Sequence, residues 1–374
     1  MRPWTALFLI PFSITLNAAS SKIPDKNPFR NPALSSLGAS TKASQVKIVF
    51  SGNVTGMRES CGCALNPKGG LERRYNYLKN EGLLSAERDN ALLLDFGNLL
   101  FKTPAYEKGG DKESFANAEA MVEGTNFFNM TAVNLGIMDR TLAPEKLSQL
   151  WAKSKFSWLA SNIIPPGRFA ASFRRRVPVN LRSGKVVLFG LSSFDDKLKE
   201  YGWTFEKPEE ALKKELADLP ADVFPIVLSD VEMSELLPLA KTVKRPVLFL
   251  GARESGGWDR PIEVGGALLV HLRQQGQDWG VFKFSLPTKA KSGWYNPSDS
   301  EDLARRWDDL VTEAHTVRGL ASSNQRNVEV EKIEAQIKEM LTIAPQPNDI
   351  AFAFETIEMN AAFDGENVVS KFMK

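Results

Sequence analysis

Two apolar stretches that each run into a turn of glycine and polar residues constrain this 374-residue chain more than any other feature. The first reads IVFSGNVTG from Ile48 to Gly56, and the second reads ALLLDFGN from Ala91 to Asn98. Short, continuous apolar runs bounded by such turns are typical of strands buried in an α/β sheet. Because α/β folds carry their functional residues at the carboxyl ends of strands, these turns are the first candidates for a site.

Up to Leu286 the chain repeats this alternation of apolar strands and amphipathic helices. The predicted strands are Val46–Ser51, Ala91–Phe96, Ala132–Leu135, Trp158–Ala160, Val177–Leu181, Lys185–Leu191, Val223–Leu228, Val247–Leu250, Ala267–Leu272 and Gly280–Leu286. The predicted helices are Gly70–Asn80, Ser114–Phe128, Pro144–Lys153, Pro208–Asp218 and Glu232–Val243. Such alternation predicts a layered α/β domain with buried sheets, to which we assign residues 45–290.

A different pattern fills residues 291–374. Apolar side chains recur at spacings of four and three on two successive segments, which predicts a helical hairpin whose seam packs within the chain. The seam residues are Leu303, Trp307, Leu310, Ala314 and Val317 on the first segment, and Ile333, Ile337, Met340 and Leu341 on the second. We then expect a strand at Asp349–Met359, which alternates apolar and polar residues, and a short closing helix at Glu366–Met373.

The N-terminus reads as a targeting signal. Residues 1–19 combine Arg2, an apolar run from Trp4 to Leu16 and small residues for cleavage, the layout of a signal peptide. Residues 20–44 are rich in Ser, Pro, Asn and Lys, which predicts a flexible leader. No other stretch approaches 18 apolar residues, so we expect no transmembrane span after cleavage and an exported protein, periplasmic or extracellular.

The formal net charge of +2 is too close to neutral for a basic surface that would bind nucleic acid, so we expect no nucleic-acid partner. The chain has only two histidines. His271 falls in an apolar strand and His315 on the predicted hairpin, and we interpret both as structural.

The two turns and the segment between them resemble the N-terminal domain of the 5′-nucleotidase-like metallophosphoesterases. In that family T-N-D-x-H-G ends the first strand, a G-G-L-x-R-R helix follows, and D-x-G-D ends the next strand. Here Ser51–Gly56, Gly69–Arg74 and Asp95–Asn98 stand in these places. The resemblance implies a calcineurin-like, four-layer α/β sandwich, with two packed sheets flanked by helices, to which this chain adds its C-terminal helical hairpin.

The same resemblance implies a two-metal site at five strand ends, but its ligands are almost all replaced here. The degenerate metal-site positions are Asn53, Thr55, Asn98, Ile137, Met138, Asp230, Arg253 and Ser255. Asn at positions 53 and 98 removes two negative charges that would offset divalent ions, and Arg253 adds a positive one. We therefore expect no standard dinuclear site and no cofactor.

Two weaker possibilities stay open at these strand ends. One is a single divalent cation, such as Mg²⁺ or Ca²⁺, held through oxygen by a set of carboxylates. This set is Asp95, Asp139, Asp230 and Glu254. The other is a small anionic ligand contacted by Arg253, with Arg73 and Arg74 as further anion contacts. For Arg73 and Arg74 we favour the alternative that they anchor their helix to acidic neighbours.

The Cys61-Gly62-Cys63 turn holds the only two cysteines of the chain. A structural cystine, a redox-active pair and a point of metal or cofactor attachment are all open. An exported bacterial subgroup of the family resembles the chain in this turn, where C-G-C, five further residues and G-G-L-x-R-R follow one another. It also shares G-x-x-D at Gly136–Asp139.

Together these features favour an exported, metallophosphoesterase-like pseudoenzyme that has largely lost its dinuclear metal site. Its expected role is binding or interaction at the cell envelope, with an envelope protein or a small anion as partner, linked to redox chemistry through Cys61 and Cys63. The alternative is an active hydrolase of phosphate esters or nucleotides with a reduced, oxygen-ligated metal site.

Overall fold

The computed structural model describes residues 26–30, 45–62, 65–85, 87–105, 112–254, 256–258, 260–287, 293–320, 323–346 and 349–372. The described residues fall into two compact units. The smaller lies within Met1–Asn31 and Asp299–Ala344, and the larger within Pro32–Ser298 and Pro345–Lys374. The predicted signal peptide, residues 1–19, lies outside the described residues and stays a prediction.

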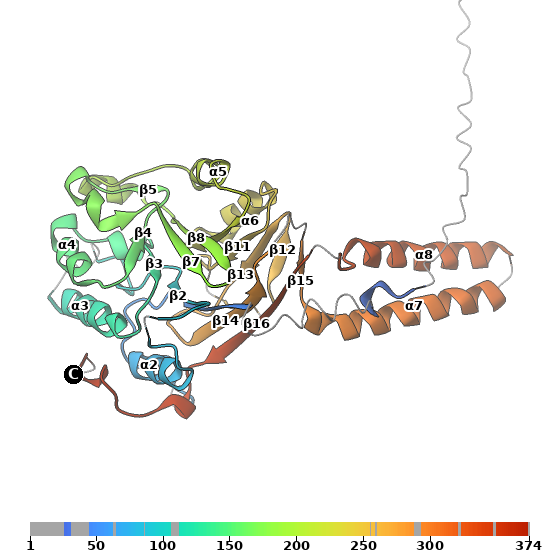
Figure 1. Ribbon diagram of the computed structural model, residues 1–374, viewed down its shortest axis with the longest axis horizontal. Coiled ribbons are helices and arrows are strands. Elements are labelled where there is room, and N and C mark those ends of the chain that lie inside the picture. The colour runs from blue at the N-terminus through green and yellow to red at the C-terminus, as the bar shows by residue number, and fades with distance from the viewer. Residues whose placement is uncertain are drawn as a thin grey trace, which may run out of the picture. The chain divides into compact units, whose positions relative to one another are not determined.

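The larger unit contains an eight-stranded and a six-stranded sheet (Figure 1). In spatial order the eight-stranded sheet consists of β15 Trp294–Tyr295, β16 Ile350–Glu358, β14 Asp278–Ser285, β1 Gln45–Ser51, β2 Ala91–Asp95, β3 Ala132–Asn134, β4 Ser157–Leu159 and β6 Phe173–Arg174. The six-stranded sheet consists of β12 Ile262–Val264, β13 Ala267–Val270, β11 Val247–Leu250, β10 Val223–Ser229, β8 Gly184–Leu191 and β7 Arg176–Leu181. A small hairpin pairs β5 Ile163–Ile164 with β9 Thr204–Phe205.

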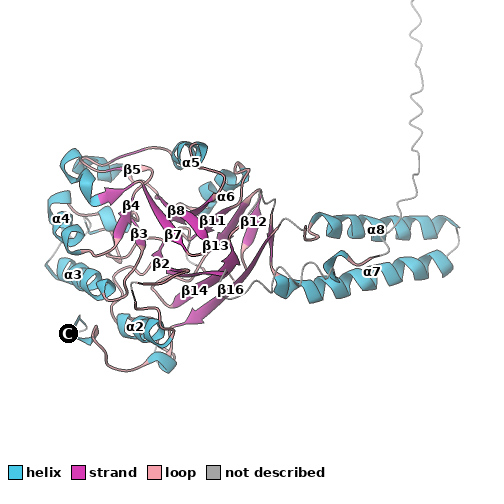
Figure 2. Ribbon diagram, viewed as in Figure 1, coloured by secondary structure: helices cyan, strands magenta, loops and turns pink. Residues whose placement is uncertain are grey.

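Alternate residues of the strands face different layers, as the period of a β-strand requires. In β1, Ile48 and Phe50 enter the core between the sheets together with residues of β8, β10 and β11. Val49 points the other way, into the core shared with the outer helices. Helices therefore cover the outer faces of both sheets (Figure 2). Their bounds are α2 Leu71–Asn80, α3 Lys112–Asn126 and α4 Pro144–Lys153 on the eight-stranded sheet, and α5 Pro208–Ala217 and α6 Met233–Lys241 on the six-stranded sheet.

The smaller unit is the predicted helical hairpin, formed by α7 Ser300–Leu320 and α8 Ser323–Thr342. Its seam buries Trp307, Ala314 and Ile337, as the periodicity predicts, but Leu341 is 38% exposed, so its predicted place in the seam was wrong. The described part of the predicted leader, residues 26–30, packs on α7, where the rings of Phe29 and Trp307 meet edge to face.

The predicted two-sheet α/β sandwich with a C-terminal helical hairpin is thus confirmed. The predicted strand at Asp349–Met359 forms as β16, and it pairs antiparallel with β14 inside the eight-stranded sheet. The predicted closing helix is reduced to a 3₁₀ turn at Ser370–Phe372. In the described residues no helix has the length and apolar character needed to cross a membrane.

Candidate functional site

The strand ends that the sequence singles out lie at the carboxyl edges of parallel strands. β1, β2 and β3 run parallel in the eight-stranded sheet, and β8, β10 and β11 run parallel in the six-stranded sheet. The register pairs Ser51 with Asp95, so the first two turns leave the sheet side by side. Hydrogen bonds between loops that follow β3, β8 and β10 show that both sheets contribute to one edge.

The backbone is unusual at this edge. Asn53, Thr55 and Asn98 all have positive φ angles, of 47°, 51° and 60°. This region disfavours side chains, above all a β-branched one such as Thr, and such conformations concentrate at functional sites. Gly251 follows β11 with φ 89°, and an added Cβ there would lie 2.2 Å from the ring of Phe96. Tight turns therefore bring the two sheets into close approach here.

Asn53 and Asn98 are bonded to each other. The Nδ2 of Asn98 donates to the Oδ1 of Asn53 at 2.8 Å, and the Nδ2 of Asn53 donates to the carbonyl of Ala252 at 3.2 Å. The backbone N–H of Met138 donates to the Oδ1 of Asn98 at 3.0 Å. Both side chains are buried. Their oxygens, which would be the metal-binding atoms, accept hydrogen bonds from the protein itself.

Asp139 accepts backbone hydrogen bonds on both carboxylate oxygens. The N–H groups of Asn98 and Gly136 donate to Oδ2 at 2.9 and 3.0 Å, and the N–H of Leu100 donates to Oδ1 at 2.8 Å. Burial raises the pKa of Asp139 to about 7, although the hydrogen bonds from Leu100 and Gly136 lower it. Asp139 thus holds the turn after β2 against the turn after β3.

Asp230 joins the two sheets. Its Oδ2 accepts the N–H of Ile137 at 2.6 Å, and its Oδ1 accepts the N–H of Ser193 at 2.8 Å. Burial raises the pKa of Asp230, while the charge of Arg140 and, less strongly, that of Arg253 lower it. Asp230, one of the four carboxylates predicted as possible cation ligands, is therefore bonded on both oxygens to the loops after β3 and β8.

Asp95 lies in a buried chain of hydrogen bonds with Ser51 and Arg74. The hydroxyl of Ser51 donates to Oδ2 of Asp95 at 2.6 Å and accepts from Nη2 of Arg74 at 2.6 Å. The guanidinium lies 3.9 Å from the carboxylate and packs against the rings of Trp279 and Phe128, at 4.7 and 5.3 Å. Burial raises the pKa of Asp95, and Arg74 lowers it. Arg74 therefore anchors α2 to the sheet.

Arg140 is a site residue that the sequence reasoning missed. Its side chain is fully buried, donates to the carbonyls of Gly136 at 3.2 Å and Ser193 at 2.5 Å, and stacks on Trp203. Burial lowers its pKa to about 10, so it stays charged at neutral pH beside Asp230 and Asp139. Two buried guanidinium groups thus supply positive charge beside buried carboxylates, Arg74 at Asp95 and Arg140 at Asp230 and Asp139. One clue to Arg140 was available in the sequence, because this residue directly follows the predicted Gly136–Asp139 motif.

The remaining predicted positions that the structure describes have varied surroundings. Arg253 is partly exposed and pairs with Glu232 at 2.5 Å, and Glu254 accepts from the indole of Trp258 at 3.2 Å. The backbone N–H of Thr55 donates to the carbonyl of Asn98 at 2.7 Å, and Ile137 is buried in the outer core. Ser255 lies outside the described residues. Within the described ranges, no three His, Cys, Asp or Glu side chains are grouped so as to hold a metal ion.

His271 is a core residue beside this edge. Its Nδ1 accepts the N–H of Ala252 at 3.2 Å, and its ring contacts Phe96 and Trp258. Burial lowers its pKa, which favours a neutral imidazole. His315 lies on the exposed face of α7.

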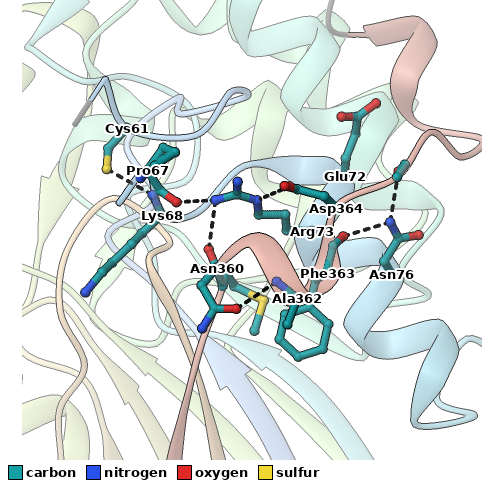
Figure 3. A network of polar contacts seen from close by, with 12 residues as sticks. Cys61, Pro67, Lys68, Glu72, Arg73, Asn76, Asn360, Ala362, Phe363 and Asp364 are labelled. Carbon is teal, nitrogen blue, oxygen red and sulfur yellow. Dashed lines mark hydrogen bonds and ion pairs between the residues drawn. The ribbon is translucent and has the colours of Figure 1, made fainter. Parts of the chain in front are cut away.

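Cys61 belongs to a loop that is closed on itself and held by the C-terminal segment (Figure 3). The N–H of Cys61 donates to the carbonyl of Lys68 at 2.8 Å, and the N–H of Lys68 donates to the Cys61 Sγ at 3.2 Å. The ammonium of Lys68 pairs with Glu358 on β16. Cys63 lies outside the described residues, so the predicted pairing of the two cysteines stays a prediction.

Arg73 joins this loop to α2 and to the C-terminal segment (Figure 3). Its Nε lies 2.6 Å from Asp364, and its Nη1 donates to the carbonyls of Pro67 and Met359. Asn76, one turn further along α2, donates to the carbonyls of Phe363 and Gly365, both at 2.9 Å. The guanidinium that we considered as an anion contact is thus bonded to acceptors of the protein.

No protein-family model matches the sequence, and no curated protein matches it. Solved structures do match by fold. A 5′-nucleotidase precursor from Thermus thermophilus aligns with a TM-score of 0.54 at 20% identity over 74% of this chain and 59% of its own. The sulfate thiohydrolase SoxB from the same organism aligns with a TM-score of 0.50 at 15% identity over 64% of this chain and 54% of its own.

The calcineurin-like phosphoesterase YfkN from Bacillus subtilis aligns with a TM-score of 0.51 at 13% identity over 80% of this chain and 99% of its own. This chain therefore spans little more than half of the first two structures and nearly all of the third. At such low identity the likeness extends to the fold alone. The chain thus has the α/β fold that 5′-nucleotidases share with calcineurin-like phosphoesterases.

Proposed function

We propose that this chain is an exported binding or interaction protein of the cell envelope, built on the phosphoesterase fold, that does not hydrolyse phosphate esters. The observation that carries the proposal is the network of hydrogen bonds at the strand ends. The side-chain amide of Asn98 donates to the Oδ1 of Asn53, and backbone N–H groups donate to the carboxylate oxygens of Asp139 and Asp230 that a metal would need. Binding a cation would break several buried hydrogen bonds, each costly to leave unmade.

The charge at this edge supports the same proposal. Arg74 lies buried beside Asp95, and Arg140 lies buried beside Asp139 and Asp230. These two guanidinium groups already supply positive charge to the carboxylates, as divalent ions would. A divalent cation brought to this network would meet two fixed guanidinium groups. We therefore propose no resident metal, and the single-cation alternative becomes one outcome of the test.

The test is metal analysis and turnover on the purified full-length chain. After incubation with Mg²⁺, Mn²⁺ or Zn²⁺ and removal of free ions, we expect no stoichiometric metal and no hydrolysis of p-nitrophenyl phosphate or of nucleoside monophosphates. Stoichiometric metal, together with turnover that is lost in Asp230→Asn, would establish the hydrolase instead. Circular dichroism of the variant separates a lost site from a lost fold.

The proposed role is redox-linked through the Cys-Gly-Cys turn. Support comes from the two cysteines in a chain with a predicted export signal, and from the hydrogen bonds between Cys61 and Lys68. We expect mass spectrometry after alkylation to show thiol and disulfide forms interconverting across a series of dithiothreitol buffers. Cys61→Ser and Cys63→Ser each leave a single thiol and serve as controls. A single state throughout the series removes the redox part and leaves the rest of the proposal in place.

Export is tested by fractionation. We expect the expressed chain in the periplasmic or secreted fraction, with a mass that corresponds to cleavage near residue 19. Retention of an uncleaved chain in the cytoplasm would exclude a role in the envelope.

A further inference from the structure

A cavity of about 790 Å³ lies at the opposite edge of the six-stranded sheet from the candidate site. It is lined by residues at the amino ends of three parallel strands, with Lys185 in β8, Phe224 in β10 and Pro246 just before β11. All of its lining residues belong to the larger unit. Its volume is within the range of roughly 300–1,000 Å³ that is typical of small-molecule sites.

One part of the wall is apolar. Leu219, Val223, Phe224, Pro246 and Leu286 line it, and Phe224 is held in place by ring contacts with Phe284 and Trp294 at 5.0 and 5.9 Å. Gly184 widens the cavity opposite Leu286, since an added Cβ would lie 3.1 Å from the Cδ1 of Leu286. An alkyl or aromatic group would contact apolar side chains here.

The polar part of the wall is positively charged. Lys185, Lys244 and Arg245 line the cavity with a single carboxylate, Asp222. In the described part of the chain, the ion pair at this cavity joins Lys185 to Asp222 at 3.7 Å, between exposed side chains. Positive charge therefore exceeds negative charge around the cavity.

Arg245 is fixed in place by the loop beside it. Its guanidinium donates to the carbonyls of Leu219 at 3.1 Å, Pro220 at 3.3 Å and Val223 at 2.7 Å. These bonds hold the group without neutralising its charge. Lys244, the preceding residue, is exposed at the rim of the same wall. A pre-organised cation beside an apolar wall favours a ligand that combines an anionic group with an apolar body.

The geometry points to a binding site for an amphipathic organic anion, with its charged group beside Lys244 and Arg245 and its apolar body against Leu219, Phe224 and Leu286. The site is separate from the strand-end network and does not depend on whether that network has any activity. Free carboxylic acids with an alkyl chain and anionic lipids in a membrane share this chemistry, and the experiment distinguishes the two sources.

The experiment uses the purified full-length chain and titrates decanoate by calorimetry, with decan-1-ol as the uncharged counterpart. We expect one decanoate per chain, and no competition by decan-1-ol at equal concentration. Lys244→Glu should weaken decanoate binding by about tenfold, because it places a negative charge beside the bound anion. Lys213→Glu makes the same change of charge at an exposed position of α5 outside the cavity, and it should leave binding unchanged.

A second variant tests the location without changing charge. Ala221→Trp, at an exposed lining position, should occupy part of the cavity and weaken binding while the thermal unfolding midpoint stays within a few degrees. Three results would overturn the proposal. They are no decanoate binding up to about 1 mM, the weak end of specific affinities, equal binding of decan-1-ol, and equal weakening by Lys244→Glu and Lys213→Glu. Binding to phosphatidylglycerol vesicles without binding of free decanoate would overturn it in favour of a membrane surface.

Discussion

At the carboxyl ends of β8 and β10, Ser193 and Asp230 are buried and bonded within the protein, whereas at the amino ends of β8, β10 and β11 polar side chains surround an open cavity. Both edges arise from the same parallel sheet, so the strands themselves do not cause the difference. At the carboxyl edge a second sheet adds its own turns, and every buried polar group there requires a partner. Substitutions should therefore lower the free energy of unfolding far more at the carboxyl edge of the sheet than at its amino edge.

The largest expected effect is that of Arg140→Met at the closed edge. The change leaves Asp230 without its strongest charge partner and removes a donor from the carbonyls of Ser193 and Gly136, the latter of which keeps the N–H of Asp139. We expect a loss of about 3–5 kcal/mol in the free energy of unfolding, measured by urea denaturation at pH 7. Arg305→Met, on the exposed face of α7, is the control and should stay within about 0.5 kcal/mol. A loss below about 1 kcal/mol for Arg140→Met would break the comparison.

Asn98→Asp comes next. The new carboxylate would face the Oδ1 of Asn53, which now accepts from Asn98 at 2.8 Å. We expect destabilisation of about 2–4 kcal/mol in metal-free buffer, because a buried charge gains no partner. Asn129→Asp is the matched control, because Asn129 also has a positive φ but is exposed. It should lower the free energy of unfolding much less. Full stability of Asn98→Asp with a bound divalent ion would reveal a latent metal site.

The third prediction concerns pH. The pKa of Asp139 is raised to about 7 in the folded chain from its ordinary value of 3.8, so the folded state holds a proton that the unfolded state loses in this range. The resulting stabilisation is complete below about pH 4 and is lost as the pH rises to about 7. Asp139→Asn should therefore be more destabilising at pH 4.5 than at pH 7.5 in urea unfolding. The opposite trend would contradict a raised pKa.

Arg73→Leu should have a smaller effect. The substitution removes the donors to Pro67 and Met359 and the pair with Asp364, whose side chain is 58% exposed. We expect a loss of about 1–2 kcal/mol, with faster amide hydrogen exchange in both the Cys61 loop and residues 359–372. Asp364→Ala should loosen the C-terminal segment alone. Unchanged exchange in the Cys61 loop of Arg73→Leu would show that the loop is held without this arginine.

The smallest effect is expected at the open edge. Lys185 and Asp222 are 61% and 69% exposed and 3.7 Å apart, so replacing either by Ala should change stability by less than about 0.5 kcal/mol. Thermal unfolding measures this directly. A cost near that of Asn98→Asp would mean that the two edges do not differ in the way proposed.

The strands that could be predicted from the sequence are those with continuous apolar runs, such as β1, β8 and β10, because burial on both faces leaves a visible pattern. The two-residue strands β5, β6, β9 and β15 escaped prediction, since two residues carry no period. The place of β16 also could not be predicted. Its alternation indicates a strand, but its pairing with β14 depends on contacts between residues about 70 to 80 positions apart in the chain.

The candidate site, like the fold, could be predicted from the sequence only in part. The turns of Asn53 and Asn98, and the carboxylates Asp95, Asp139 and Asp230, could be located from the sequence because they follow predicted strands. Their partners could not be predicted. Ser193 and Arg140 lie 53 positions apart, and the network between them exists only where two sheets meet.

The sequence by itself determined the layered α/β architecture and the helical hairpin, because periodicity and residue type are local properties, and its resemblance to a known family predicted replaced metal ligands at the strand ends. Only the tertiary structure decided that the replaced positions bond to one another, that two arginines lie buried beside the carboxylates, and that a positively charged cavity opens at the other edge of the six-stranded sheet. Burial makes this difference, because a polar group or charge removed from water must be satisfied by whichever residues the fold brings next to it.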